Sequence, residues 1–249
     1  MKAIILAAGQ GTRLMPLTKD KPKCMVEIKE KPIIDYILET MTSAGIKDII
    51  IVNGYQNNVL EKYLNNKEIK FITNFDYKIT NMVYTLFMAV NEMNDNLIIS
   101  YSDIIYSKEV LTTLINDDSK CSVVVDKEWY KLWSLRMENP LSDAETMKLN
   151  NKNNIIELGK KTQSYSDIQG QYIGLIKFSK EILPKIKEIY QNADRTILYD
   201  NQTFKNMYMT SFLQLIINLG IDVKAVLING GWFEVDTLTD VSIFNKLNK

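Results

Sequence analysis

The sequence of 249 residues contains no histidine and only two cysteines, Cys24 and Cys121. The absence of histidine excludes Ser-His-Asp and Cys-His nucleophilic catalysis as well as His-ligated zinc. Two isolated cysteines form neither a metal-ligand cluster nor a disulfide framework, and they favour a reducing compartment. Any catalysis must therefore rely on carboxylates, cations, hydroxyls or a bound metal.

The sequence also lacks net charge and long hydrophobic runs. It has 30 basic and 30 acidic residues, so no overall field attracts nucleic acid or an anionic membrane. No apolar run reaches the ~18 residues that a membrane span requires. The chain enters an apolar segment at once, which predicts no signal peptide. We therefore expect a cytoplasmic protein without a nucleic-acid or membrane partner, and its oligomeric state stays open.

Short apolar runs alternate with segments in which apolar residues recur at helical spacing. The runs at residues 3–6, 49–52, 97–100, 122–125 and 223–228 are predicted to be buried strands. This alternation predicts an α/β fold, a Rossmann-like three-layer sandwich with a mainly parallel central sheet. Residues 128–177 are richer in Asn, Lys and Glu, and there we expect antiparallel strands and loops, a small antiparallel β embellishment beside the main sheet.

A glycine loop follows the first predicted strand, in the string Leu-Ala-Ala-Gly-Gln-Gly-Thr-Arg-Leu at residues 6–14. Gly9 and Gly11 have no Cβ, so their backbone can approach an anion closely. Arg13 can bind two phosphate oxygens at once, and Lys23 supplies a compact charge. The loop lacks the Gly-Lys-Ser/Thr of a Walker A motif and the third glycine of a dinucleotide fingerprint. A phosphate cradle and a plain βα turn are the two remaining interpretations.

Two carboxylates follow predicted strands. Asp103 comes after the run 97–100, and Asp236 lies between the last predicted strand and a predicted helix. Ligands of parallel sheets bind at the carboxyl ends of the strands, and Mg²⁺ takes a few protein oxygens together with substrate phosphates. The alternative for each residue is a turn or a helix N-cap.

The string at residues 6–14, together with Pro16-Leu17-Thr18 and Pro22-Lys23, resembles the signature of a nucleotidyltransferase family. Its members join a nucleoside triphosphate to a sugar phosphate or a small alcohol phosphate. The resemblance implies that Asp103 and Asp236 hold Mg²⁺, with Glu234 as a helper, and that Arg13 and Lys23 are catalytic. Residues implied to bind the nucleotide are Leu6, Ala8, Gly9, Gly11, Thr12, Arg13, Thr80, Asn81 and Ser102.

The stretch at residues 74–86 resembles the element of the branch that uses CTP and small alcohol phosphates. Asn81 is suited to hydrogen bonds with a base or ribose, whereas Thr80 also fits a helix N-cap. Lys160 resembles the second lysine of the family, which binds the acceptor phosphate, and Lys161 is the alternative. Further predictions concern the acceptor: Arg136 would bind a carboxylate bidentately, Tyr172 would line the acceptor site, and Trp129, Tyr130 and Trp133 fit ordinary packing better than an aromatic box for choline.

These features lead to one main hypothesis and three alternatives. The main hypothesis is a Mg²⁺-dependent cytidylyltransferase that transfers CMP from CTP to a small phosphorylated acceptor, with L-glutamine phosphate in capsule modification as the leading candidate. The alternatives are a phosphocholine cytidylyltransferase, a sugar-1-phosphate nucleotidyltransferase and a nucleotide-binding regulator without turnover. We treat residues 1–249 as a single domain with a nucleotide-binding half (1–126) and an acceptor-binding half (127–249).

Overall fold

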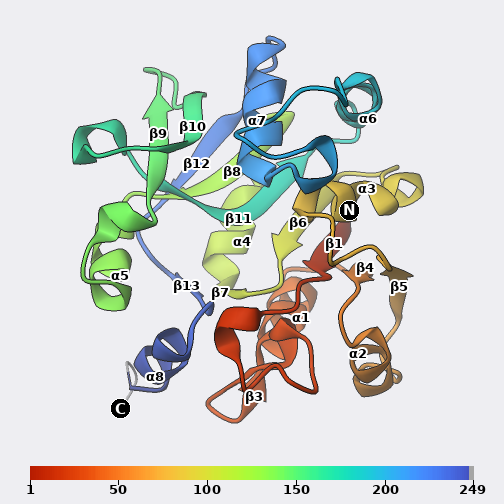
Figure 1. Ribbon diagram of the computed structural model, residues 1–249. Helices are drawn as coiled ribbons and strands as arrows, with labels where there is room; N and C mark the ends of the chain where they lie inside the picture. Colours follow the sequence, from red (N-terminus) through yellow and green to blue (C-terminus); the bar gives the residue numbers. More distant parts are fainter. Residues whose placement is uncertain (247–249) are drawn as a thin grey trace.

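A central sheet of seven strands organises the computed structural model, which describes residues 1–246 (Figure 1). Its strands, in spatial order, are β12 (Lys224–Ile228), β8 (Cys121–Asp126), β11 (Gln171–Phe178), β6 (Leu97–Tyr101), β1 (Lys2–Ala7), β4 (Asp48–Asn53) and β5 (Ile69–Thr73). Neighbouring strands are parallel except where β11 pairs antiparallel with β6 and β8. The predicted mainly parallel sheet is confirmed.

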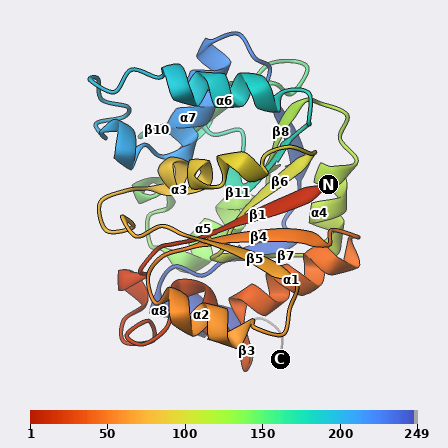
Figure 2. The ribbon, with the colours of Figure 1, turned by 90° about the vertical axis from the view of Figure 1, so that its right-hand side faces the viewer.

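Helices cover both faces of the sheet, which makes three layers (Figure 2). One face carries α1 (Ile33–Ser43), α2 (Asn57–Tyr63) and α4 (Lys108–Ile115), and the other carries α3 (Met82–Met88), α6 (Leu183–Asn192) and α7 (Met209–Asn218). Successive side chains of a strand point to opposite faces. In β1, accordingly, Ala3 and Ile5 belong to one buried core, whereas Ile4 and Leu6 belong to the other.

The segment 128–177 differs from its prediction in two ways. Residues Trp129–Arg136 form a helix, α5, instead of strand or loop, because Trp129 and Trp133 lie four residues apart and bury the same helical face. Strand β11 lies inside the central sheet and not beside it, since it hydrogen-bonds to both β6 and β8. The antiparallel embellishment itself is present as β9 (Glu145–Leu149) and β10 (Ile155–Lys161), of which β10 packs against α7.

Two further strand pairs are short. The pair of β7 (Ile104–Tyr106) with β13 (Trp232–Glu234) brings residues far apart in sequence together, while β2 (Glu27–Ile28) pairs with β3 (Lys31–Pro32). Helix α8 (Leu238–Lys246) follows β13 and contacts α5. The short 3₁₀ helices are η1 (Thr12–Leu14), η2 (Lys23–Met25), η3 (Val90–Glu92), η4 (Pro140–Ser142), η5 (Tyr165–Asp167) and η6 (Phe204–Asn206).

The central sheet takes strands from both sides of residue 126, since β12 pairs with β8 and β11 pairs with β6. The single domain and its two functional halves stay predictions, and residues 247–249 at the end of the second half lie outside the described part. Across residues 1–246, the helices are too short or too polar to cross a lipid bilayer.

Candidate active site

The loop after β1 offers backbone N–H groups to a ligand. Gly11 has φ of +61°, and a Cβ at this position would lie 2.9 Å from the Cβ of Lys23, so only glycine fits. A Cβ on Gly9 would meet no atom within 4 Å. Within residues 1–246, the N–H groups of Gly9, Gln10 and Gly11 donate to no protein acceptor. The loop therefore presents free donors of the kind that bind phosphate.

Lys23 lies at the centre of a buried charge cluster. Its Nζ is 2.6 Å from Asp103 Oδ2 and 2.6 Å from Asp236 Oδ1, and only 13% of its side chain is exposed. Burial by itself would lower the pKa of Lys23, but the two aspartates outweigh burial and raise it. The lysine is therefore a fixed ammonium ion that bridges both carboxylates.

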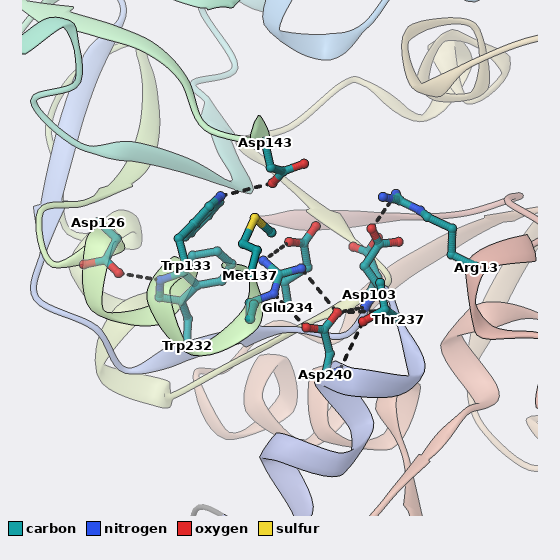
Figure 3. Close-up of polar contacts among 12 residues, drawn as sticks. Arg13, Asp103, Asp126, Trp133, Met137, Asp143, Trp232, Glu234, Thr237 and Asp240 are labelled. Carbon is teal, nitrogen blue, oxygen red and sulfur yellow. Dashed lines mark hydrogen bonds and ion pairs between the residues drawn. The ribbon is translucent and has the colours of Figure 1, made fainter. Parts of the chain in front are cut away.

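Asp103 and Asp236 meet because two chain segments pair. Asp103 lies in the turn between β6 and β7, and Asp236 follows β13, the partner of β7. The N–H of Val235 donates to the carbonyl oxygen of Asp103 at 2.8 Å, which ties the two turns together. Arg13, 66% exposed, forms an ion pair with Asp236 (Figure 3). The structure thus brings Arg13, Lys23 and both aspartates into one cluster.

The two carboxylates fit a divalent cation that is shared with a substrate. Asp103 Oδ1 is buried and has no hydrogen-bond partner in the described residues, so one hard oxygen ligand is free. Across the same residues, no three His, Cys, Asp or Glu side chains gather into a set able to hold a metal ion. Two carboxylates with phosphate and water oxygens are the usual environment of Mg²⁺.

A second charged network adjoins Asp236, and Figure 3 shows its members Glu234, Thr237 and Asp240. Asp240 is 1% exposed and accepts hydrogen bonds from the N–H groups of Asp236 and Thr237 at 2.9 and 2.8 Å. The guanidinium of Arg136 pairs with Asp240 at 2.8 Å and with Glu234 at 2.6 Å. Burial raises the pKa of Glu234 to about 7, although Arg136 counteracts this effect.

This network bears on the prediction that Arg136 binds an acceptor carboxylate. Its side chain is 3% exposed, and its guanidinium already binds two carboxylates of the chain. A ligand carboxylate would have to displace Glu234 or Asp240 from a buried pair, which is strongly unfavourable. Arg136 therefore holds Glu234 and Asp240 in position, and the sequence prediction of direct acceptor binding disagrees with the observed geometry.

A cavity of about 120 Å³ opens beside the glycine loop. Six of the residues predicted to bind the nucleotide line it: Leu6, Ala8, Gly9, Thr80, Asn81 and Ser102. Lys23 and Asp103 of the charge cluster line it as well. Gly11, Thr12 and Arg13 are not part of the lining and lie along the same loop. Asn81, and not Thr80, is the N-cap of α3, and its side-chain oxygen accepts from the N–H of Met82 at 2.8 Å. Thr80 instead donates to the carbonyl oxygen of Asp76.

A second cavity, of about 200 Å³, shares Met82 and Tyr101 with the first. Tyr172, predicted for the acceptor site, lines it. Gly174 in β11 has φ of +89°, and a Cβ there would lie 2.5 Å from the ring of Tyr101. The glycine therefore lets Tyr101 form the wall between the cavities. The remaining lining residues are Trp133, Asp143, Glu145, Gln171, Ile173, Tyr208, Met209, Thr210, Trp232 and Glu234.

The two candidate lysines of β10, Lys160 and Lys161, have different partners. Lys160 pairs with Glu157 at 2.8 Å, and neither residue lines a cavity. Lys161 is the cross-strand partner of Glu145, and its Nζ donates to the carbonyl oxygen of Asp143 at 3.2 Å. The β9–β10 register shifts between Leu158 and Lys161, and Lys161 then lies opposite Glu145, which lines the second cavity. Lys161 is not itself among the lining residues, but its position favours it over Lys160 as the cation nearer to that cavity.

The aromatic residues of the middle segment differ in whether they line a cavity. Trp129 and Tyr130 pack against each other and against Tyr165, away from both cavities, as ordinary packing predicts. Trp133 lines the second cavity, and its Nε1 donates to Asp143 at 3.0 Å. Glu145 and Tyr101 are cavity residues that sequence reasoning missed. The position of Tyr101, two residues before Asp103, was the one signal available for it, whereas no motif marks Glu145.

A family model described as nucleotidyl transferase matches residues 2–130. The chain is 53% identical, over 250 residues, to the CTP:phosphoglutamine cytidylyltransferase of Campylobacter jejuni subsp. jejuni serotype O:2, and the alignment covers 98% of each protein. It is 36% identical over 106 residues to the choline-phosphate cytidylyltransferase of Streptococcus pneumoniae, which covers 43% of this chain and 46% of the relative.

Solved structures share the fold. The CTP:phosphocholine cytidylyltransferase from Streptococcus pneumoniae superposes with a TM-score of 0.76 at 22% identity, over 100% of this chain and 99% of the other. The inositol-1-phosphate CTP transferase from T. maritima superposes with a TM-score of 0.76 at 20% identity, over 100% and 96% of the two chains.

Proposed function

Because this chain belongs to the nucleotidyl transferase family, we propose that it transfers CMP from CTP to L-glutamine phosphate and releases pyrophosphate. The choice of CTP and of this acceptor is supported by the 53% identity to the Campylobacter jejuni enzyme over almost the whole chain. The role in capsule modification stays a prediction.

One observation carries the catalytic part of the proposal. Lys23, Arg13 and two carboxylates converge beside a loop with three N–H groups that have no protein acceptor in the described residues, and Lys23 and Asp103 line the adjoining cavity. The reaction joins two anions, so repulsion between them is the main obstacle. A site with preorganised cations and amide donors lowers that barrier by charge neutralisation and positioning.

Each group has a defined task in this proposal. The N–H groups of Gly9, Gln10 and Gly11 bind the β- and γ-phosphates, and Arg13 neutralises the charge that develops on the departing pyrophosphate. Lys23 draws the acceptor phosphate toward the α-phosphorus. An oxygen of that phosphate forms the new P–O bond while the bond to pyrophosphate breaks. The attacking oxygen is already ionised near pH 7, so no general base is required.

Asp103 and Asp236 would hold Mg²⁺, whose chemistry when bound is to neutralise and orient phosphate oxygens. Their present partner is Lys23, whose Nζ occupies the space between them. A cation held by the two aspartates would compete with Lys23 for them, and Lys23 would then have its ammonium available to a phosphate.

A pyrophosphate-release assay tests the function. CTP and UTP are each combined with L-glutamine phosphate, phosphocholine and glucose 1-phosphate in the presence of Mg²⁺. The expected result is release with CTP and L-glutamine phosphate, and little with the other pairs. Turnover only with phosphocholine would identify phosphocholine as the acceptor. Turnover only with UTP and glucose 1-phosphate would identify the sugar phosphate as the acceptor. No turnover with any pair, despite CTP binding, would support the nucleotide-binding regulator.

A further inference from the structure

The second cavity contains more acid than base. Three carboxylates line it, Asp143, Glu145 and Glu234, and no lysine or arginine is among its lining residues. Glu234 is neutralised by Arg136, and Asp143 accepts a hydrogen bond from Trp133. The carboxylate of Glu145, in contrast, forms no hydrogen bond or direct ion pair with any described residue, and only the more distant charge of Lys161 partly compensates it. Among the carboxylates that line this cavity, Glu145 is therefore the one without a direct partner.

Backbone contacts hold Glu145 in place while leaving its side chain free. The backbone N–H of Glu145 donates to the side-chain oxygen of Gln171 at 3.3 Å, and the backbone carbonyl oxygen of Glu145 accepts from the side-chain nitrogen of Gln171. Lys161 lies opposite Glu145 in the β9–β10 register but directs its Nζ to the carbonyl oxygen of Asp143. Burial raises the pKa of Glu145 to about 7, and Lys161 offsets part of that effect. A partly buried carboxylate of this kind gains from a cationic ligand.

A second polar group of the same cavity has spare hydrogen-bonding capacity. The hydroxyl oxygen of Tyr172 is buried and makes no hydrogen bond of good geometry in the described residues, and the polar group that acts on it is the phenol of Tyr101. Its ring packs edge-on against Tyr101, with ring centroids 5.8 Å apart. Buried polar atoms without a partner are uncommon in proteins, and a bound ligand is a normal explanation. Glu145 and Tyr172 together offer a carboxylate and a phenol oxygen, both able to accept hydrogen bonds.

We infer that the second cavity binds a protonated primary amine of the acceptor, with Glu145 as its counter-ion and Tyr172 as a second hydrogen-bond acceptor. This inference rests on the proposed function, because it places the acceptor beside the nucleotide cavity across Met82 and Tyr101. A primary ammonium has three N–H donors for the unpaired oxygens, whereas a quaternary ammonium has none. The surrounding rings of Trp133 and Trp232 shield the ion pair from water. Phosphorylated L-glutamine carries such an amine.

The experiment compares L-glutamine phosphate with its N-acetyl derivative, in which the amine is uncharged. Both are titrated into wild-type protein by calorimetry and used as acceptors with CTP and Mg²⁺. We expect the N-acetyl derivative to bind and react about 10- to 100-fold more weakly, as for the loss of a hydrogen-bonded charge. Glu145→Gln should reduce binding of L-glutamine phosphate by a similar factor, mainly through KM, with an unchanged KM for CTP.

Matched measurements separate this subsite from a general defect. Glu138→Gln is the control, since Glu138 is exposed and lines neither cavity. Glu145→Gln should bind the N-acetyl derivative within about threefold of wild type, because that ligand has no ammonium to lose. Equal binding of the two ligands to wild type, or equal losses for both in Glu145→Gln, would overturn the inference. Calorimetry tests the amine subsite even if the assay detects no turnover. Normal binding of the acceptor without turnover would contradict the proposed function but not the amine subsite.

Discussion

At the residue scale, Arg13 is the most exposed charge of the cluster, with an ion pair to Asp236. If it neutralises the departing pyrophosphate, Arg13→Ala should lower kcat/KM by the equivalent of about 2–4 kcal/mol. The loss should fall mainly on kcat, because the charge develops in the transition state. Arg195→Ala, at an exposed site outside both cavities, serves as the control. A change confined to KM would assign Arg13 to ground-state binding.

Lys23 occupies the space between Asp103 and Asp236, so it competes with any divalent cation for the two carboxylates. Lys23→Met should therefore bind Mn²⁺ at least about tenfold more tightly than wild type in the absence of nucleotide. Electron paramagnetic resonance of Mn²⁺ measures this affinity directly. Lys21→Met is the matched control, since Lys21 pairs with Glu27 away from the aspartates. Weaker or unchanged Mn²⁺ binding in Lys23→Met would contradict the competition.

At the element scale, the β9–β10 hairpin carries a carboxylate that is unfavourable in its ionised form. Burial raises the pKa of Glu145 to about 7, from an ordinary value of 4.5 in the unfolded chain. The folded state then holds a proton that the unfolded state has lost, so the free energy of unfolding falls as pH rises from about 4.5 to about 7.

Glu145→Gln should remove that penalty. We expect the variant to be more stable than wild type at pH 8, by about 1–3 kcal/mol, and equally stable at pH 4.5. Urea unfolding at the two pH values measures the difference, and Glu138→Gln should show none. A variant that is more stable yet binds the acceptor weakly would also exclude misfolding as the cause of its binding defect. Lower stability of the variant at pH 8 would contradict the assigned penalty.

Helix α8 depends on Asp240 at its first turn. This buried carboxylate accepts from two backbone N–H groups and pairs with Arg136. Asp240→Ala should lower the free energy of unfolding by about 3–5 kcal/mol, because it leaves Arg136 with an incomplete set of partners and removes the acceptor for Asp236 and Thr237. Urea denaturation measures the loss, and Asp222→Ala provides an exposed control. A loss below about 1 kcal/mol would show that Arg136 and the turn find other partners.

At the scale of the whole molecule, the site joins segments that are distant in sequence. Lys23 is separated from Asp103 by 80 residues and from Asp236 by 213 residues. A ligand that binds here stabilises contacts across the fold. CTP with Mg²⁺ at about 100 times its Kd should add about 2.7 kcal/mol to stability and raise Tm by roughly 5–10 °C.

Differential scanning fluorimetry, with CTP alone and with CTP plus Mg²⁺, measures this effect. Replacement of both carboxylates in Asp103→Asn/Asp236→Asn should abolish the part of the shift that requires Mg²⁺. The shift with CTP alone should persist, since the glycine loop is intact. A Mg²⁺-dependent shift of normal size in the double variant would remove these aspartates from the metal site.

The prediction succeeded where the evidence is local. Alternation of apolar runs and helical spacing is enough to determine a mainly parallel sheet with helices on both faces, because side-chain burial repeats with the period of each element. The position of Asp103 after a buried strand also follows from neighbouring residues, whereas the steric requirement for glycine at position 11 comes from Lys23 and Thr18 and is seen only in the fold.

Other features depend on contacts that short-range patterns do not encode. Strand β11 lies in the main sheet because it pairs with β6 and β8. The packing of α5 against α8 places Arg136 where it forms ion pairs with Glu234 and Asp240. The bridge from Lys23 to both aspartates, the pairing of Lys161 with Glu145 across β9 and β10, and the lack of a direct partner for the Glu145 carboxylate likewise arise from long-range packing. Coulomb interactions depend on the distance between charges in space. Which charged groups pair is therefore determined only by the tertiary structure, which brings them within a few ångströms of one another.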